Sequence, residues 1–178
     1  MLAAWDRAAL TLARAAIDSS DPMSAIHLVE SAMRPPKNLG ESRHPLANVS
    51  QLLLTLGDAW AEAGDATRAE SYWSQASESA SDFTRMSATP FSTKTYYAIL
   101  SLYHLGKVEE AREMTRQLSI WVENIAVSAA RIDFFATSLP TMLLFTDDPA
   151  IERDRAVRVI RSQIADLADT KKEILVEL

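Results

Sequence analysis

The side chains of this sequence that could do chemistry are mainly carboxylates. Asp58 and Glu62 form the closest useful pair. Because they lie four residues apart, they share one face if the segment is helical. Two carboxyl groups on either side of a sugar linkage hydrolyse glycosidic bonds. A solvated acidic face explains the same spacing. We therefore keep a carbohydrate-related role, to which Glu41 could also contribute, as the alternative to a non-catalytic protein.

Other catalytic or metal-binding patterns are weak. The sequence contains no cysteine, which excludes disulfides, thiolate ligands and cysteine nucleophiles. His27, His44 and His104 fall in different parts of the chain, without a second histidine at helical spacing. The 4 glycines are scattered and cannot form a phosphate-binding loop. We expect no metal site, no cofactor and no catalytic residues.

Charge and hydropathy restrict the class of partner. The 178 residues carry 18 Lys and Arg against 24 Asp and Glu, for a net charge of -6. An acidic chain of this kind disfavours nucleic-acid binding. No uncharged apolar run approaches the roughly 20 residues of a membrane-spanning helix. Asp6 and Arg7 interrupt the apolar stretch that a signal peptide needs. We expect a soluble, cytoplasmic protein that binds neither nucleic acid nor a membrane.

The elements that position these side chains are predicted to be helices. Alanine is abundant, glycine is rare, and no segment shows the alternating pattern of a strand. Asp21 and Asp65 are expected to cap helices, and Gly64 and Gly106 to end them. The segment 170–178 is either a continued helix or a frayed end. The predicted helices are about 2–18, 22–34, 46–63, 65–80, 92–105, 107–128, 131–145 and 149–169, which pair into hairpins at about 2–34, 46–80, 92–128 and 131–169.

A repeat runs through these hairpins. Ala25, Ala69 and Ala111 are 44 and 42 residues apart, each about one turn into the second helix of a hairpin. Small residues at such positions let two antiparallel helices approach closely. The clearest unit has the tetratricopeptide spacing, with Leu53, Leu56, Gly57, Trp60, Gly64, Ala69, Trp73 and Ala76. We therefore predict an all-α, tetratricopeptide-like superhelix of three to four antiparallel hairpins, as a single domain over 1–178.

Several longer segments add a more specific resemblance. From about residue 20 to 155 the chain resembles the C-terminal helical-repeat region of a bacterial protein family whose N-terminal β-sandwich domain has no known function. That domain is thought to be carbohydrate-related and has no counterpart in this chain. The resemblance implies a neighbouring β-sandwich domain as one candidate partner, and it assigns no catalytic residues. The segments that carry it are 36–43, 56–60, 96–98, 105–111 and 132–140.

The repeat pattern also indicates a binding surface. In tetratricopeptide arrays, fixed positions of each first helix line the concave face, and tyrosine there offers contact area at low entropic cost. The Lys and Asn pattern that some arrays use to bind peptide carboxylates is missing. Tyr96 and Tyr103 could equally belong to the core. The candidate concave-face residues are Arg14, Gln51, Asp58, Glu62, Tyr96, Tyr103 and His104.

The polar loop before the third helix is a second candidate surface. Asn38, Glu41 and Arg43 lie in it, and they could contact a ligand or another domain. Alternatively, Asn38 and Gly40 form a turn whose role is structural. Taken together, the sequence predicts a non-catalytic protein-interaction or scaffolding module that binds a protein or peptide. A homodimer is also compatible with the sequence, since neither end of the predicted array has a strongly polar cap.

Overall fold

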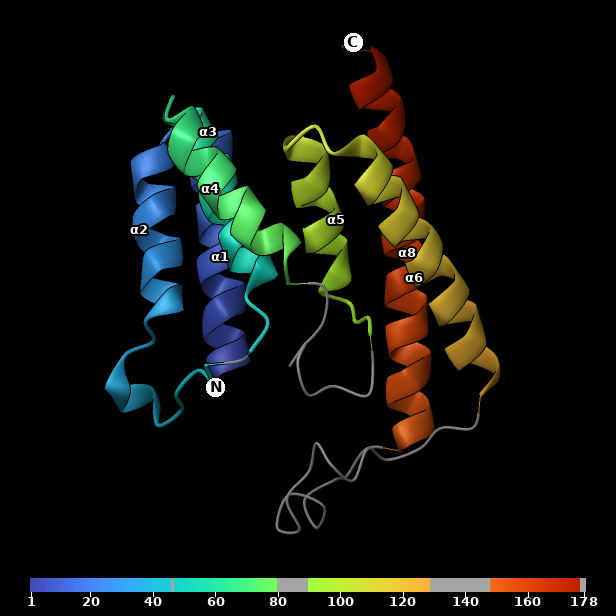
Figure 1. Ribbon diagram of the computed structural model, residues 1–178. Coiled ribbons are helices and arrows are strands. Elements are labelled where there is room, and N and C mark those ends of the chain that lie inside the picture. The colour runs from blue at the N-terminus through green and yellow to red at the C-terminus, as the bar shows by residue number, and fades with distance from the viewer. Residues whose placement is uncertain (46, 80–89, 129–147, 177–178) are drawn as a thin grey trace. The chain divides into compact units, whose positions relative to one another are not determined.

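The chain folds into helices joined by turns and loops, as the computed structural model in Figure 1 shows. The structure describes residues 1–45, 47–79, 90–128 and 148–176, with the backbone alone at 149 and 169–176. Within these ranges every regular element is helical and no strand occurs, which confirms the all-α prediction. Two compact units, Met1–Arg112 and Glu113–Leu178, are described separately below.

The first unit contains two helical hairpins in succession and the beginning of a third. Their bounds follow the predicted ones closely, apart from two late starts described below. No helix within the described residues is long and apolar enough to span a lipid bilayer. The elements are α1 (Leu2–Asp18), α2 (Pro22–Met33), the short 3-10 turn η1 (Lys37–Leu39), α3 (Ser50–Glu62), α4 (Ala66–Ser77), α5 (Thr95–His104) and the start of α6 (Val108–Val127).

The three hairpin turns share one pattern of backbone hydrogen bonds. In the first turn, Ser20 N–H donates to the carbonyl of Ile17 and Asp21 N–H donates to the carbonyl of Ala16, both at 2.9 Å. These two bonds satisfy the last carbonyls of the helix in a Schellman motif. The corresponding donor and acceptor pairs of the other turns, at 2.9 to 3.0 Å, are Gly64 and Ala61, Asp65 and Trp60, Gly106 and Tyr103, and Lys107 and Leu102.

The motif requires a left-handed residue at one position. The φ angle there is +79° at Gly64, +71° at Gly106 and +58° at Ser20. A serine adopts this conformation at a cost of about 1 kcal/mol that glycine does not incur. The first turn therefore keeps the shape of the other two even though its sequence departs from the repeat.

The first two hairpins begin their second helices in the same way. Asp21 accepts a hydrogen bond from Ser24 N–H at 3.2 Å, and Asp65 accepts one from Arg68 N–H at 3.0 Å. Both aspartates are N-caps, as predicted, and Pro22 occupies the first turn of α2. A carboxylate at this position satisfies an unpaired amide and opposes the positive end of the helix dipole.

Consecutive hairpins pack by a repeated rule. The first helix of a hairpin contacts its own second helix and the first helix of the next hairpin, so that α1 packs on α2 and α3, and α3 packs on α4 and α5. The second helix also contacts the following first helix, as α2 does with α3 and α4 with α5. The helices α1, α3 and α5 consequently form one row (Figure 1).

Small residues make this close packing achievable. Ala25, Ala69 and Ala111 are each 0% exposed, as predicted from their spacing. Gly57 has the same role against an aromatic ring, since a Cβ atom there would lie 2.4 Å from Cδ1 of Trp73. No carbon atoms approach that closely without displacement.

Two helices of this unit begin later than predicted. The third starts at Ser50 rather than 46, because the Asn48 side chain accepts a hydrogen bond from Ser50 N–H at 2.9 Å in a turn. The fifth starts at Thr95 rather than 92, since Ser92 N–H donates to the Thr95 hydroxyl at 2.9 Å. Side-chain bonds of this kind compete with helical backbone bonds.

The second unit consists of the rest of α6 and of α8 (Pro149–Val176). Arg161 on α8 binds Glu123 on α6 through two contacts of 3.0 and 2.6 Å. Among the residues of this unit whose side chains are described, Leu118, Val122, Val157, Ile160 and Leu167 are buried and apolar. The last helix runs past the predicted end near 169, so the backbone of 170–176 continues it.

Some predictions fall on residues outside the described ranges. These are the helix near 131–145 with Pro140, the resemblance segment 132–140, and most of the loop 81–90. The single domain over 1–178 also stays a prediction.

Candidate functional site

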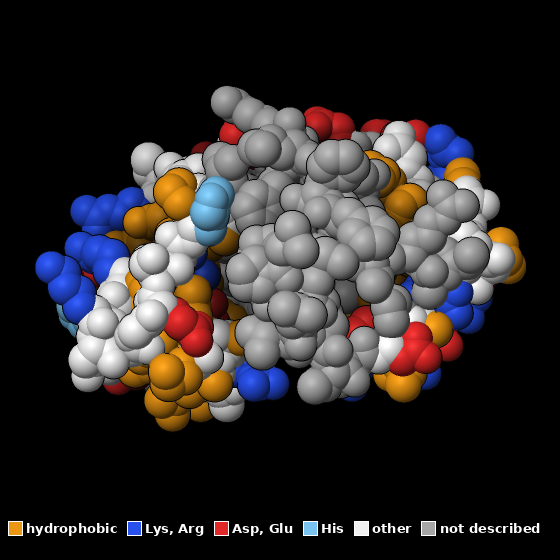
Figure 2. Space-filling view, turned by 90° about the horizontal axis from the view of Figure 1, so that it is seen from below, with side chains coloured by type: hydrophobic (Ala, Val, Ile, Leu, Met, Phe, Trp, Pro, Cys, Tyr) orange, Lys and Arg blue, Asp and Glu red, His pale blue; other side chains and the backbone are white. Residues whose placement is uncertain are grey.

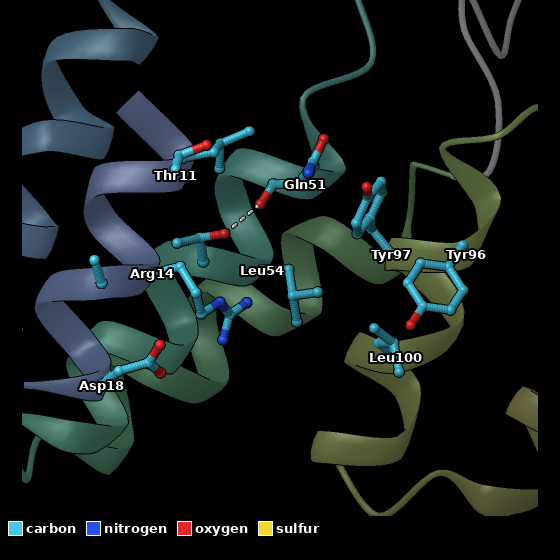
Figure 3. A pocket seen from close by; sticks show the side chains of 11 residues that line it. Thr11, Arg14, Asp18, Gln51, Leu54, Tyr96, Tyr97 and Leu100 are labelled. Carbon is cyan, nitrogen blue, oxygen red and sulfur yellow. Dashed lines mark hydrogen bonds between the residues drawn. The ribbon is translucent and has the colours of Figure 1, made fainter. Parts of the chain in front are cut away.

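A groove of about 510 Å³ opens along the row of first helices. Figure 3 shows its polar and apolar side chains converging from α1, α3 and α5. The lining residues all belong to the first unit. They are Leu10, Thr11, Arg14, Ala15 and Asp18 from α1, Gln51, Leu54 and Thr55 from α3, and Tyr96, Tyr97 and Leu100 from α5.

Equivalent repeat positions line the groove on each helix. Leu10, Leu54 and Tyr96 lie 44 and 42 residues apart, which are the separations of the three core alanines. The next residues along the chain, at 11, 55 and 97, also line the groove. The groove is therefore a product of the repeat, with one row of side chains contributed by each hairpin.

Arg14 is the cationic group of the groove lining. Its Nη2 lies 3.4 Å from Oδ2 of Asp58, and its side chain remains 53% exposed. A guanidinium carries five N–H donors in a planar fork, so a single long contact leaves donors for a ligand. The carboxylate of Asp18, one turn further along α1, lines the same groove and is exposed.

Asp58 on α3 is not part of this lining, and its carboxylate contacts side chains of α1, α4 and α5. Its Oδ1 accepts a hydrogen bond from Trp73 Nε1 of α4 at 3.1 Å and lies 3.5 Å from His104 Nε2 of α5. The rings of Trp73 and His104 stack, with centroids 4.6 Å apart. Because these contacts leave the Asp58 side chain only 14% exposed, its main role is to hold the groove helices in place.

The α5 side of the groove is aromatic. The rings of Tyr96 and Tyr97 meet edge to face at 5.3 Å between centroids. The ammonium group of Lys94 lies 5.6 Å from the Tyr97 ring and donates to Oε1 of Gln51 at 3.1 Å. Burial, followed by the neighbouring Tyr96, raises the pKa of Tyr97 above its ordinary value. This side offers a ligand broad apolar faces with polar edges.

The structure brings together part of the predicted concave face. Arg14, Gln51 and Tyr96 line the groove. Tyr103, the other tyrosine for which both alternatives stood open, is 7% exposed, belongs to the core and lies outside the groove lining. Glu62 and His104 are exposed but lie outside the groove lining. Asp58 and Glu62 therefore do not form a carboxylate pair within it.

Sequence reasoning missed the second row of lining residues, at positions 11, 55 and 97. The signal was present, since each directly follows one of the repeat-equivalent positions 10, 54 and 96. Whether that neighbour also faces the groove depends on how each helix is rotated against the next hairpin, and the repeat pattern does not specify this rotation.

The loop 35–45 uses its charged side chains internally. Arg43 binds both carboxylate oxygens of Asp6 on α1, at 3.0 and 2.7 Å, and donates to the carbonyl of Ala32 on α2 at 2.9 Å. Glu41 accepts hydrogen bonds from the amino group of Met1 and from Leu2 N–H, both at 2.7 Å. The bond from the amino group is the main reason that the pKa of Glu41 is lowered.

A second hollow of about 450 Å³ lies beside this loop, lined by residues that include Met33, Lys37 and Arg43. Asn38 is exposed in η1 and is not part of its lining. Figure 2, seen from below the view of Figure 1, shows hydrophobic, basic, acidic and uncharged side chains intermixed at the left. The loop thus ties α1 to α2, in line with its structural interpretation.

Within the described residues, no group of three or more histidine and acidic side chains is arranged to hold a metal ion. The geometry of the groove is suited to hold an elongated ligand by apolar contact at one level and ion pairing at the next.

In comparisons with family models, curated proteins and solved structures, this chain matched none of them.

Proposed function

We propose that the first unit is a tetratricopeptide-like array that binds an extended segment of a partner protein in the groove along α1, α3 and α5. The observation that carries this proposal is the register of the groove. Equivalent residues of three consecutive hairpins line it. Such a surface offers an extended ligand contacts from α1, α3 and α5 together, and suits it better than a compact small molecule.

The composition of the groove supports a peptide ligand. Leucines and tyrosines provide apolar area, and Arg14, Asp18 and Gln51 provide polar groups at its edges. Interfaces gain most of their binding energy from a few aromatic, aliphatic and arginine anchors inside a polar rim. The groove is open along its side, so a ligand can reach it without movement of a helix.

The alternative of a carbohydrate-related accessory protein has less support. In this alternative the chain is either the helical accessory to a β-sandwich domain absent from it or itself contributes Asp58, Glu62 or Glu41 to a substrate site. Asp58 holds Trp73 and Arg14, and Glu41 holds the start of α1. A neighbouring β-sandwich domain remains one candidate partner, and the cytoplasm remains the proposed location.

Selection of peptides on the full chain tests the proposal. We expect a phage-displayed library of random dodecapeptides to give binders, and expect Tyr96→Ala to weaken each by about ten-fold, as loss of an anchor does. Isothermal titration calorimetry of the synthetic peptides measures this loss. If no peptide binds, or if the binders are indifferent to Tyr96→Ala, the groove is not the binding surface.

Arg14→Ala and Arg34→Ala form the matched pair for this experiment. Each arginine is more than half exposed and makes one ion pair at 3.4 Å, with Asp58 and Glu30 respectively. Arg34 lies at the end of α2, outside the groove. Peptide binding should therefore fall with Arg14→Ala and stay unchanged with Arg34→Ala.

A further inference from the structure

Three groove residues of α1 differ in chemistry along one line. Leu10, Arg14 and Asp18 all line the groove and follow one another at four-residue steps. Each step advances about 6 Å along the helix axis. In an extended peptide, side chains on the same side recur every second residue, at about 6.7 Å. Three same-side residues of a peptide laid along α1 would thus face these three side chains in turn.

Each level offers one kind of contact. At the first level, Leu10 is half-buried, and its repeat equivalents Leu54 and Tyr96 line the same groove. At the second, Arg14 presents a guanidinium that is only partly used by Asp58. At the third, Asp18 presents an exposed carboxylate. The complementary ligand groups are an apolar side chain, a carboxylate and a cationic side chain, in that order.

We propose that the groove selects an extended segment whose alternate residues are apolar, acidic and basic, read from Leu10 toward Asp18. This inference rests on the proposed peptide-binding function and names its ligand class. The acidic residue pairs with the fork of Arg14, which suits a carboxylate. The basic residue pairs with Asp18, and the apolar residue lies against Leu10.

The order of the two charges sets the selectivity. A segment of identical composition with the charges exchanged would place its carboxylate against Asp18 and its cation against Arg14. Juxtaposed like charges at an interface are costly and suppress the wrong ligand. The groove should therefore distinguish two peptides that differ only in the order of these residues.

The wild-type chain is tested first, with the peptides selected from the dodecapeptide library. We expect the enriched sequences to align with an acidic residue in the middle of three alternate positions, flanked by an apolar and a basic residue. A synthetic peptide with exchanged charges should bind about ten-fold more weakly, since charged hydrogen bonds are lost. Fluorescence anisotropy of the labelled peptides gives both affinities.

Exchanging the charges of the protein provides the reciprocal test. The double variant Arg14→Asp with Asp18→Arg should prefer the exchanged peptide and reject the original one. Glu30→Arg with Arg34→Glu is the matched control, since it exchanges an exposed pair at the same spacing outside the groove. This control should leave both affinities unchanged. Far-ultraviolet circular dichroism verifies that each variant is folded.

A single variant keeps the test decisive if the double variant does not fold. Asp18→Lys alters an exposed side chain and should remove the preference for a basic residue at the third position. Binders that depend on Tyr96 but show no charge order would overturn this inference and leave the proposed function standing. A library that yields no binder would overturn both.

Discussion

The groove and the loop 35–45 both contain charged side chains that the sequence marks as candidates for binding, but the structure uses them differently. Arg43 makes three short contacts and is 15% exposed on its side chain. Arg14 makes one contact at 3.4 Å and is 53% exposed. A largely buried arginine held by three short contacts stabilises the fold, whereas an exposed one with a single long contact can bind a ligand. The four predictions below break or sharpen this contrast.

The largest effect is expected from Gly57→Ala, which tests how rigidly the groove is supported. The new Cβ would lie 2.4 Å from two atoms of the Trp73 ring, whose Nε1 binds Asp58. Strain and the loss of that hydrogen bond cost about 4 kcal/mol. Alanine regains about 1 kcal/mol in helix propensity. Urea denaturation should show a net loss of about 3 kcal/mol, and a loss near zero would mean that Trp73 moves freely.

Arg43→Ala should destabilise the protein without weakening peptide binding. It leaves the carboxylate of Asp6 without its bidentate partner and frees the carbonyl of Ala32. Loss of charged hydrogen bonds in a partly buried site costs about 2 kcal/mol. Denaturation measures the stability, and calorimetry with a selected peptide measures binding. A loss of affinity larger than the unfolded fraction explains would place the loop in the binding surface.

Arg14→Ala should have the opposite profile. Its exposed pair with Asp58 contributes less than about 0.5 kcal/mol to folding, as is typical of surface ion pairs. A double-mutant cycle with Asp58→Asn gives this coupling energy directly. Asp58→Ala alone should cost more than Arg14→Ala, because it also removes the acceptor of the Trp73 hydrogen bond. Equal costs for the two single variants would contradict the supporting role of Asp58.

The smallest effect concerns how the stability of the protein falls at alkaline pH. Burial raises the pKa of Tyr97 in the groove above its ordinary value. The pKa of Tyr97 in the folded protein exceeds its unfolded pKa of about 10, so this tyrosine stabilises the folded protein below the unfolded pKa. That contribution is lost as the pH rises through the folded pKa. Burial also raises the pKa of Tyr103, so tyrosinate absorbance should show late titration that Tyr97→Phe reduces but does not abolish. Titration of all tyrosines together at the ordinary pKa would show that this part of the groove is open to water.

The parts of the fold that could be predicted depend on local chemistry. The aspartate caps, the glycine turns and the spacing of the three core alanines each act within a few residues. Because they recur in register, they also indicate which helices are first in their hairpins, and hence where the groove lies. Arg14, Gln51 and Tyr96 could be assigned to the groove for this reason.

The parts that could not be predicted depend on distant contacts. Arg43 and Asp6 pair although 37 residues separate them, and the sequence around each gives no sign of the pairing. Tyr97 lines the groove while Tyr103 is buried, and both outcomes depend on how α5 packs against its neighbours, which include α3 and α4. The helix starts near Ser50 and Thr95 depend on individual side-chain bonds that compete with the backbone.

The shared Schellman geometry of the three turns has a consequence for how this chain can change. Each turn is closed by the same two backbone hydrogen bonds, which an inserted residue would break. Variation in chain length is therefore confined to the loops between hairpins. The turn sequence around Gly64 can replace the one around Ser20, which would remove the cost of a serine in the left-handed conformation. The three turns are then interchangeable, and changes in chain length fall in the loops between hairpins, where they leave the row of first helices undisturbed.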